Sequence, residues 1–206
     1  MFLNPFIRMF TAPARFAVLA TVLALSGCTV GGTTAIRSVS GQSQLEASVR
    51  ELVYSASDAN TADIYLSDLP PAALEPDADL SQVSGQLVHI HVFITPEAGS
   101  TPIDPSACSV VFRSVVIARG QLGLYGGGAF MNPRNTPGAD VLRASILAGT
   151  CRLLTSTPGF VDRLGPSEFR ASFNVPRNDA RAARLRARFN TMLELMPQTP
   201  APKSKP

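Results

Sequence analysis

The sequence has no tryptophan, and only 7% of its 206 residues are aromatic. Sugar-binding surfaces commonly stack their ligands on aromatic rings, so the composition gives little support to a carbohydrate-binding platform. The hydrolase motifs G-x-S-x-G, S-x-x-K and H-E-x-x-H are also missing. Carboxylates are plentiful, but the sequence alone assigns no pair of them to acid–base catalysis. An enzymatic activity is therefore unsupported, and we expect no cofactor.

Cysteine and histidine are scarce as well. The three cysteines form no C-x-x-C pair, which argues against a redox catalyst or a thiolate zinc site. Cys108 and Cys151 leave two alternatives open: a disulfide that closes a loop of about 43 residues, or two separate thiols. The only histidines, His89 and His91, are two positions apart in an apolar run, so both rings point to one face of a strand. Local sequence offers no third ligand, so no metal site is predicted and the two histidines stay weak candidates.

The glycine-rich stretch 123–128 does not have the composition of a phosphate-binding loop. No Lys-Ser/Thr pair follows it, and no G-x-G-x-x-G pattern opens a helix. Successive glycines instead predict a bulge, a tight turn or the close approach of another backbone. Tyr125, within this stretch, is a candidate contact for a small ligand on the inner face of a sheet, together with His89 and His91.

Charge is distributed unevenly along the chain. Residues 28–107 contain ten acidic side chains and only two arginines, whereas residues 108–206 contain fourteen basic and five acidic side chains. Without the first 27 residues the net charge is close to zero, so the sequence pI near 9.0 does not indicate nucleic-acid binding. We expect the two halves to neutralise each other within one fold. The alternative is a basic surface that faces lipid headgroups or an acidic partner.

The N-terminus has the layout of a secretory leader. Arg8 and Arg15 precede an apolar run over residues 16–25, which is about half the roughly 20 residues that a transmembrane helix needs. The run ends in Leu25-Ser26-Gly27-Cys28.

These four residues resemble the lipobox of bacterial lipoproteins. The resemblance implies that residues 1–27 are a signal peptide, that Cys28 carries a diacylglycerol thioether, and that its new amino group usually carries a third acyl chain such as palmitate. Two or more chains are what stable anchoring requires. Thr29 stands where an aspartate would favour inner-membrane retention, so the resemblance further implies a periplasm-facing anchor in the outer membrane.

After the cysteine, small polar residues over 28–42 predict a flexible tether. Ser43 and Glu46 form an S-x-x-E capping box, and apolar residues recur behind it at helical spacing, which predicts an N-terminal helix. The strands predicted next cover residues 64–69, 87–95, 109–118, 122–130, 142–155 and 169–175. Both faces of the strand 87–95 are largely apolar, so we expect both to be covered.

A C-terminal helix is predicted after Asn178 or Asp179, either of which can cap it, and Pro197 ends it before a disordered tail over 197–206. Four arginines fall along one stripe of this helix, beside the apolar stripe: Arg177, Arg181, Arg184 and Arg188. They are weak candidates for contact with a partner or with headgroups, against the alternatives of a solvated face or pairing with the acidic first half.

The predicted fold class is therefore α+β: one domain over residues 43–196 with a largely antiparallel sheet of about six strands and a helix at each end. A β-sandwich with terminal helices is the alternative. The predicted function is a membrane-anchored envelope lipoprotein that acts as a non-enzymatic adaptor or assembly factor for an envelope protein partner. A lipoprotein that binds a small ligand or a metal is the alternative, and the sequence does not predict an oligomeric state.

Overall fold

The computed structural model of the chain describes residues 30–93 and 108–197. The predicted leader, Cys28 and nearly all of the predicted tail lie outside the described residues and stay predictions. Within the described ranges, no helix has both the length and the apolar character needed to cross a bilayer.

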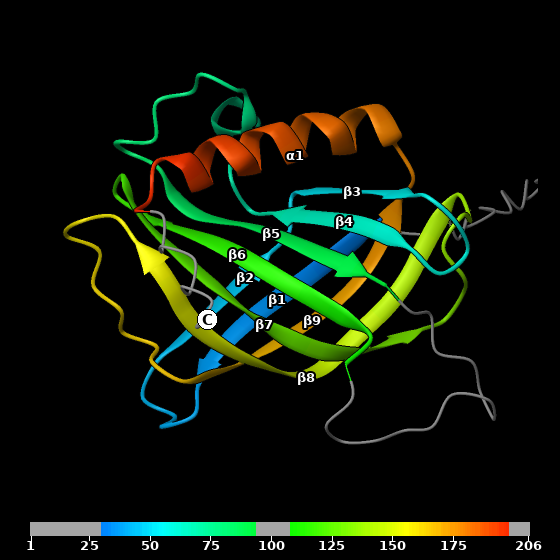
Figure 1. Cartoon of the computed structure of the whole chain (residues 1–206), viewed down its shortest axis with the longest axis horizontal. Helices are drawn as coiled ribbons and strands as arrows, with labels where there is room; N and C mark the ends of the chain where they lie inside the picture. Colours follow the sequence, from blue (N-terminus) through cyan, green and yellow to red (C-terminus); the bar gives the residue numbers. More distant parts are fainter. Residues whose placement is uncertain (1–29, 94–107, 198–206) are drawn as a thin grey trace, which may run out of the picture.

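The described residues form one antiparallel sheet of nine strands, with the order β2-β1-β9-β8-β7-β6-β5-β4-β3 (Figure 1). In chain order the strands are β1 (Gly31–Ser38), β2 (Gln44–Ser48), β3 (Glu51–Ala56), β4 (Ala62–Ser67), β5 (Ser84–Val92), β6 (Val110–Ala118), β7 (Gln121–Pro133), β8 (Val141–Ser156) and β9 (Ser167–Pro176). A short 3₁₀ turn, η1 (Pro71–Leu74), follows β4, and one α-helix, α1 (Asp179–Glu194), follows β9. The predicted antiparallel sheet and C-terminal helix are confirmed, with more strands than expected.

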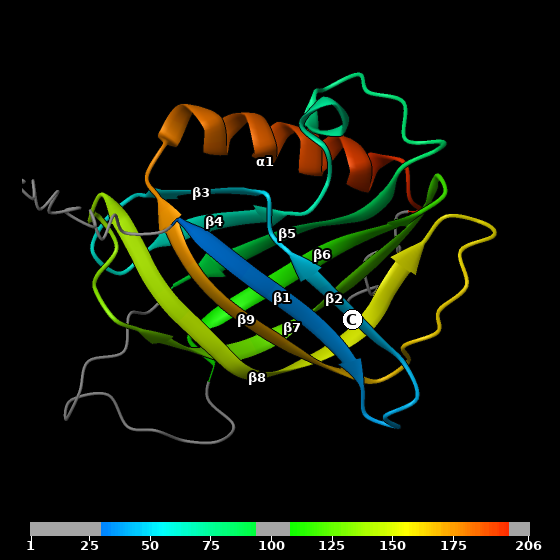
Figure 2. The same cartoon turned by 180° about the vertical axis from the view of Figure 1, so that it is seen from behind.

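The two edge strands of the sheet are neighbours in sequence. Only Val49 and Arg50 separate β2 from β3. The Val49 N–H donates to the Gly32 carbonyl of β1, and the Arg50 N–H donates to the Ser67 carbonyl of β4. The sheet therefore curls round until its two edges are joined by this link, and it encloses an interior (Figures 1 and 2).

The interior holds the larger hydrophobic core, because alternate residues of each strand point inward. In β9 the inward set is Phe169, Ala171, Phe173 and Val175, as the alternation in the sequence predicts. The ring of Phe112 in β6 stacks on Phe169 with centroids 4.1 Å apart. Three buried polar side chains cross-link this core: Gln86 donates to Thr34 over 2.7 Å and accepts from Ser114 over 3.2 Å.

The outer face of β3–β7 is covered by α1 and by the segment around η1 (Figure 2). The buried stripe of the helix consists of Leu185, Phe189, Met192 and, just beyond its end, Met196. Asn178 caps the helix as predicted, since its side chain accepts from the Arg181 N–H over 2.9 Å. Both faces of β5 are therefore covered along much of its length, as expected, one by the interior core and the other by α1.

Two predictions near the N-terminus are wrong. The helix expected from Ser43 is absent, and residues 44–56 form β2 and β3 instead. The tether expected over 28–42 is for the most part β1, a strand hydrogen-bonded to β2 on one side and β9 on the other. Both errors have one physical cause: backbone pairing of β2 with β1, of β3 with β4 and of β1 with the distant β9 outweighs local helix and turn propensity.

Candidate functional site

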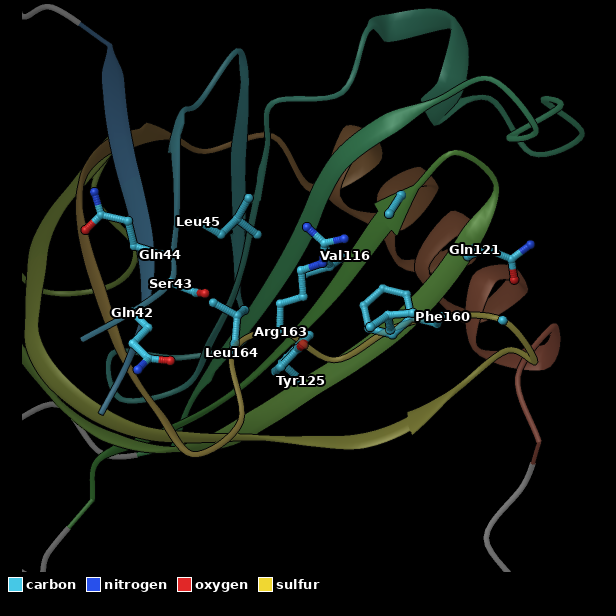
Figure 3. A pocket seen from close by; sticks show the side chains of 13 residues that line it. Gln42, Ser43, Gln44, Leu45, Val116, Gln121, Tyr125, Phe160, Arg163 and Leu164 are labelled. Atoms are coloured by element: carbon cyan, nitrogen blue, oxygen red, sulfur yellow. The ribbon is translucent and has the colours of Figure 1, made fainter. Parts of the chain in front are cut away.

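One end of the curled sheet is open and holds a cavity of about 650 Å³, which we call the mouth pocket (Figure 3). Its lining comes from five parts of the chain: the β1–β2 turn, β2, β6, β7 and the β8–β9 loop. The apolar lining residues are Leu45, Val116, Ala118, Phe160, Val161 and Leu164. Because residues 42–45 are far in the sequence from β6, β7 and the β8–β9 loop, the curling of the sheet is what brings these parts together.

Tyr125, the predicted ligand contact, belongs to the mouth pocket. It is 1% exposed, and its hydroxyl donates to the Asp162 carboxylate over 2.6 Å. Burial and the neighbouring carboxylate raise the pKa of Tyr125. Partial burial works to raise the pKa of Asp162, but the hydrogen bonds from Tyr125, Gly165 and Leu164 lower it below its ordinary value. This hydrogen-bonded pair fixes the β8–β9 loop against β7.

Phe160 forms part of the same wall. Its ring lies edge-to-face against Tyr125, with centroids 6.3 Å apart. A Cβ at Gly123 would overlap the Phe160 ring, so the glycine leaves the space that this ring fills. At Gly127 a Cβ would overlap the Thr150 carbonyl of β8. The predicted close approach of another backbone to the glycine-rich stretch is thus confirmed, and β7 also shows two register shifts against β8.

The rim of the pocket is polar. Gln42, Ser43, Gln44 and Gln121 contribute neutral groups, and Arg163 is the one charged residue among the described lining residues. The arrangement suits a molecule with an apolar body and one anionic or hydrogen-bonding head, since a guanidinium pairs well with carboxylates. A second hollow of about 1040 Å³ lies over β1, β2, β8 and β9, and its lining carries both charge signs, among them Glu46, Arg134 and Arg170.

His89 and His91 lie on the outer face of the sheet and not in the interior, so they do not join Tyr125 as the sequence suggested. The structure instead brings them together with Asp63 of β4, whose register partner is His91. The hydrogen bond from His89 holds the pKa of Asp63 well below its usual range. Burial acts to raise this pKa, whereas the hydrogen bond from His91 and the charge of Arg186 lower it further.

The four arginines of the C-terminal helix do not form one free stripe. Arg188 is 2% exposed and donates to three carbonyls around η1, those of Ala73, Pro76 and Ala78. Arg181 pairs with Glu51 over 2.7 Å. Arg177 contacts Asp179, while Arg184 is exposed. The contacts of Arg181 and Arg188 therefore lie within the domain, and Arg181 follows the alternative of pairing with the acidic first half.

The charge layout follows the simpler expectation of mutual neutralisation. Arg181–Glu51 and Arg186–Asp63 both join the basic second half to the acidic first half.

Cys108 and Cys151 are free thiols in the structure, the first exposed and the second buried. Strand β7 runs between β6, which follows Cys108, and β8, which contains Cys151, so the disulfide alternative is absent from the structure.

No family model, curated protein or solved structure matches the chain in comparisons with known proteins.

Proposed function

We propose that this chain is a lipid-anchored protein of the bacterial envelope whose domain binds one small amphipathic molecule in the mouth pocket. The observation that carries the proposal is the cavity itself. Its volume of about 650 Å³ falls within the range of about 300–1,000 Å³ that is usual for small-molecule sites. Apolar walls with a few placed polar groups are also the usual composition of such sites.

The lining favours one class of ligand. Leu45, Val116 and Phe160 offer walls for a hydrocarbon body, and Arg163 at the rim offers a bidentate partner for a carboxylate. The rest of the interior is filled by core side chains, so the ligand would enter at the mouth and not thread through the domain. A fatty acid of medium chain length has the matching chemistry.

The proposed anchor fits this arrangement. β1 begins at Gly31, three residues after Cys28, and its eight residues span about 27 Å. The β1–β2 turn that follows β1 lines the mouth pocket. A lipid on Cys28 would therefore hold the domain by the end opposite the pocket, and the mouth would face away from the anchoring bilayer. The adaptor role has less support, because Arg181 and Arg188 are engaged within the domain.

Displacement of a fluorescent fatty acid tests the proposal. Cis-parinaric acid should bind the full chain with one saturable site and be displaced by decanoate. Ala118→Trp should abolish binding, because residue 118 is exposed at the rim and a large ring there fills the entrance without disturbing the core. Arg163→Gln should weaken binding about tenfold, the effect of losing one charge-assisted hydrogen bond.

Val111→Trp is the matched control, since Val111 lies on the same strand but is 44% exposed on the outer face. It should bind like the unaltered chain. Equal binding by Ala118→Trp and Val111→Trp, both folded by circular dichroism, would place the probe elsewhere and overturn the proposal.

A further inference from the structure

Three side chains capable of binding a metal converge on the outer face of the sheet. Asp63 lies on β4 and His89 and His91 lie on β5, the neighbouring antiparallel strand. One Asp63 oxygen, Oδ1, is 2.8 Å from His89 Nε2 and 2.9 Å from His91 Nδ1. One ligand atom from each residue lies within 4.8 Å of those from the other two.

These distances suit a single ion. Two ligands about 2.1 Å from one metal are about 3.0 Å apart at a right angle and about 3.4 Å apart in a tetrahedron. The two separations that involve Asp63 Oδ1 are close to the first value, and the two histidine nitrogens lie within 4.8 Å of each other. Two imidazoles and one carboxylate leave further coordination positions to water, and this donor set suits first-row divalent ions such as zinc, iron and cobalt.

The surroundings hold the three side chains in place. The His89 ring stacks on Tyr65, with centroids 4.7 Å apart and planes 7° apart, and contacts Phe189 of α1 edge-on at 5.7 Å. Arg186 of α1 binds the other Asp63 oxygen, Oδ2, over 2.6 Å and also donates to the Tyr65 hydroxyl. The guanidinium thus orients the carboxylate and leaves Oδ1 directed at the two rings, the part that an outer-shell partner plays at metal sites.

Solvent reaches the three side chains from the side of His91. The His91 side chain is 38% exposed, whereas those of His89 and Asp63 are 22% and 17% exposed. The cluster therefore packs against Tyr65 of β4 and Phe189 of α1 and is open to solvent through His91.

From this geometry we propose that Asp63, His89 and His91 form a binding site for one divalent transition-metal ion, with zinc as the probe. The inference goes beyond the proposed ligand binding and is independent of it. On binding, His89 Nε2 and His91 Nδ1 exchange a hydrogen bond to Asp63 for a bond to the metal. In each neutral ring the proton then resides on the other nitrogen, so the net proton count is unchanged.

Histidine NMR on the full chain, purified without a polyhistidine tag, gives a direct test. The chain has only two histidines, so every imidazole signal reports on this site. Without metal, His89 should be protonated at Nε2 and His91 at Nδ1. One equivalent of zinc should switch both rings to the opposite tautomer and then saturate. Imidazole signals that are unchanged by excess zinc would overturn the proposal.

Variants separate this site from other ligands for zinc. His91→Ala and Asp63→Asn should each weaken zinc binding at least about tenfold in calorimetry, as loss of a metal ligand requires. Cys108→Ser is the control, because Cys108 is an exposed thiol outside the cluster, and it should bind zinc normally. If binding is lost in Cys108→Ser and retained in His91→Ala, zinc is bound by the thiol and the proposal is wrong.

Discussion

The inner and outer faces of the curled sheet carry candidate sites of different kinds. The mouth pocket on the inside is defined by its apolar walls, which come from five segments, with one arginine at the rim. The cluster on the outside is defined by polar contacts: the Asp63 carboxylate is hydrogen-bonded by two imidazoles and a guanidinium. The interior of this fold therefore offers volume and apolar contact, whereas the face beneath α1 offers charged and imidazole groups.

Strand β5 shows how one segment serves both faces. Val88, Ile90 and Val92 point into the interior core, and Leu87 points into the core beneath α1. The histidines share the outer face with Leu87, so the same alternation that builds the core also places the imidazoles side by side. Substitutions on one face should therefore leave the other intact, provided that the sheet itself is not disturbed.

The largest effect is expected where the curl of the sheet itself is disturbed. Gly127→Val should lower the free energy of unfolding by about 3 kcal/mol or more, because the new side chain would overlap the Thr150 carbonyl of β8. Urea denaturation measures the change. Gly31→Ala is the control, since a Cβ at Gly31 meets no atom within 4 Å. Equal stability of the two variants would show that the approach of β7 to β8 does not require glycine.

The next largest effect belongs to the outer face. Arg188→Met should lower the free energy of unfolding by about 2–4 kcal/mol, because three carbonyls around η1 lose a charged donor. Amide exchange over residues 71–80 should accelerate, while fatty-acid binding at the mouth pocket persists. Arg184→Met, at an exposed position of the same helix, should change stability by less than about 0.5 kcal/mol. Comparable losses in both variants would contradict the role given to Arg188.

A pH titration compares both faces at once through the tyrosines. Burial raises the pKa of all three: Tyr54 and Tyr125 on the inside and Tyr65 on the outside. A pKa raised on folding adds stability that is present below the unfolded value of about 10 and is lost as the pH rises above it. Tyrosinate absorbance of the folded chain should therefore appear at a higher pH than in concentrated urea, where it should appear near pH 10. Tyrosinate formed near pH 10 with intact circular dichroism would contradict the burial of these rings.

The smallest effect on stability is expected for the cysteines, and the measurement that distinguishes the two thiols is their reactivity. Burial, followed by the charge of Asp162, raises the pKa of Cys151 to about 12, and Cys108 is exposed. In a Cys28→Ser variant, a disulfide-exchange reagent at neutral pH should react quickly with one thiol and with the second only after denaturation. Adding Cys108→Ser should remove the fast reaction with little change in stability. A native chain without titratable thiols would instead show that Cys108 and Cys151 are bonded.

Part of the fold could be predicted from the sequence because some segments carry their pattern locally. The strict alternation over 169–175 and the cap and apolar stripe after Asn178 each identify an element without its neighbours. The segment after Ser43 carries a misleading pattern. Its capping box and apolar spacing suit a helix, but Leu45 and Leu52 end up at opposite edges of one sheet. The sequence did not predict β1, because its inward residues include the polar Thr34 and Ser38, which interrupt the alternation of apolar and polar residues.

The candidate sites were less predictable than the fold. The spacing of His89 and His91 correctly placed both rings on one face, but the third member, Asp63, comes from a strand 28 residues earlier and joins them only through register. A sequence does not specify register between strands whose connection is long. Phe160 and Arg163 belong to an irregular loop, and nothing in the local pattern connects them to Leu45 or Val116. The sequence indicates Tyr125 as a ligand contact through its residue type alone and contains no sign of the cavity around it.

The link between β2 and β3 affects how this protein meets other copies of itself. Exposed sheet edges are templates for intermolecular strand pairing, and proteins commonly guard them with charges, bulges or covering segments. Here the two edge strands are joined by Val49 and Arg50, and Tyr54 of β3 forms an isolated bridge to Arg177 beyond the end of β9. On the β3 edge, an incoming strand would have to displace Arg177 from its bridge to Tyr54. The short link and this bridge should therefore hinder pairing of β3 with a strand from another copy of the chain at high local concentration.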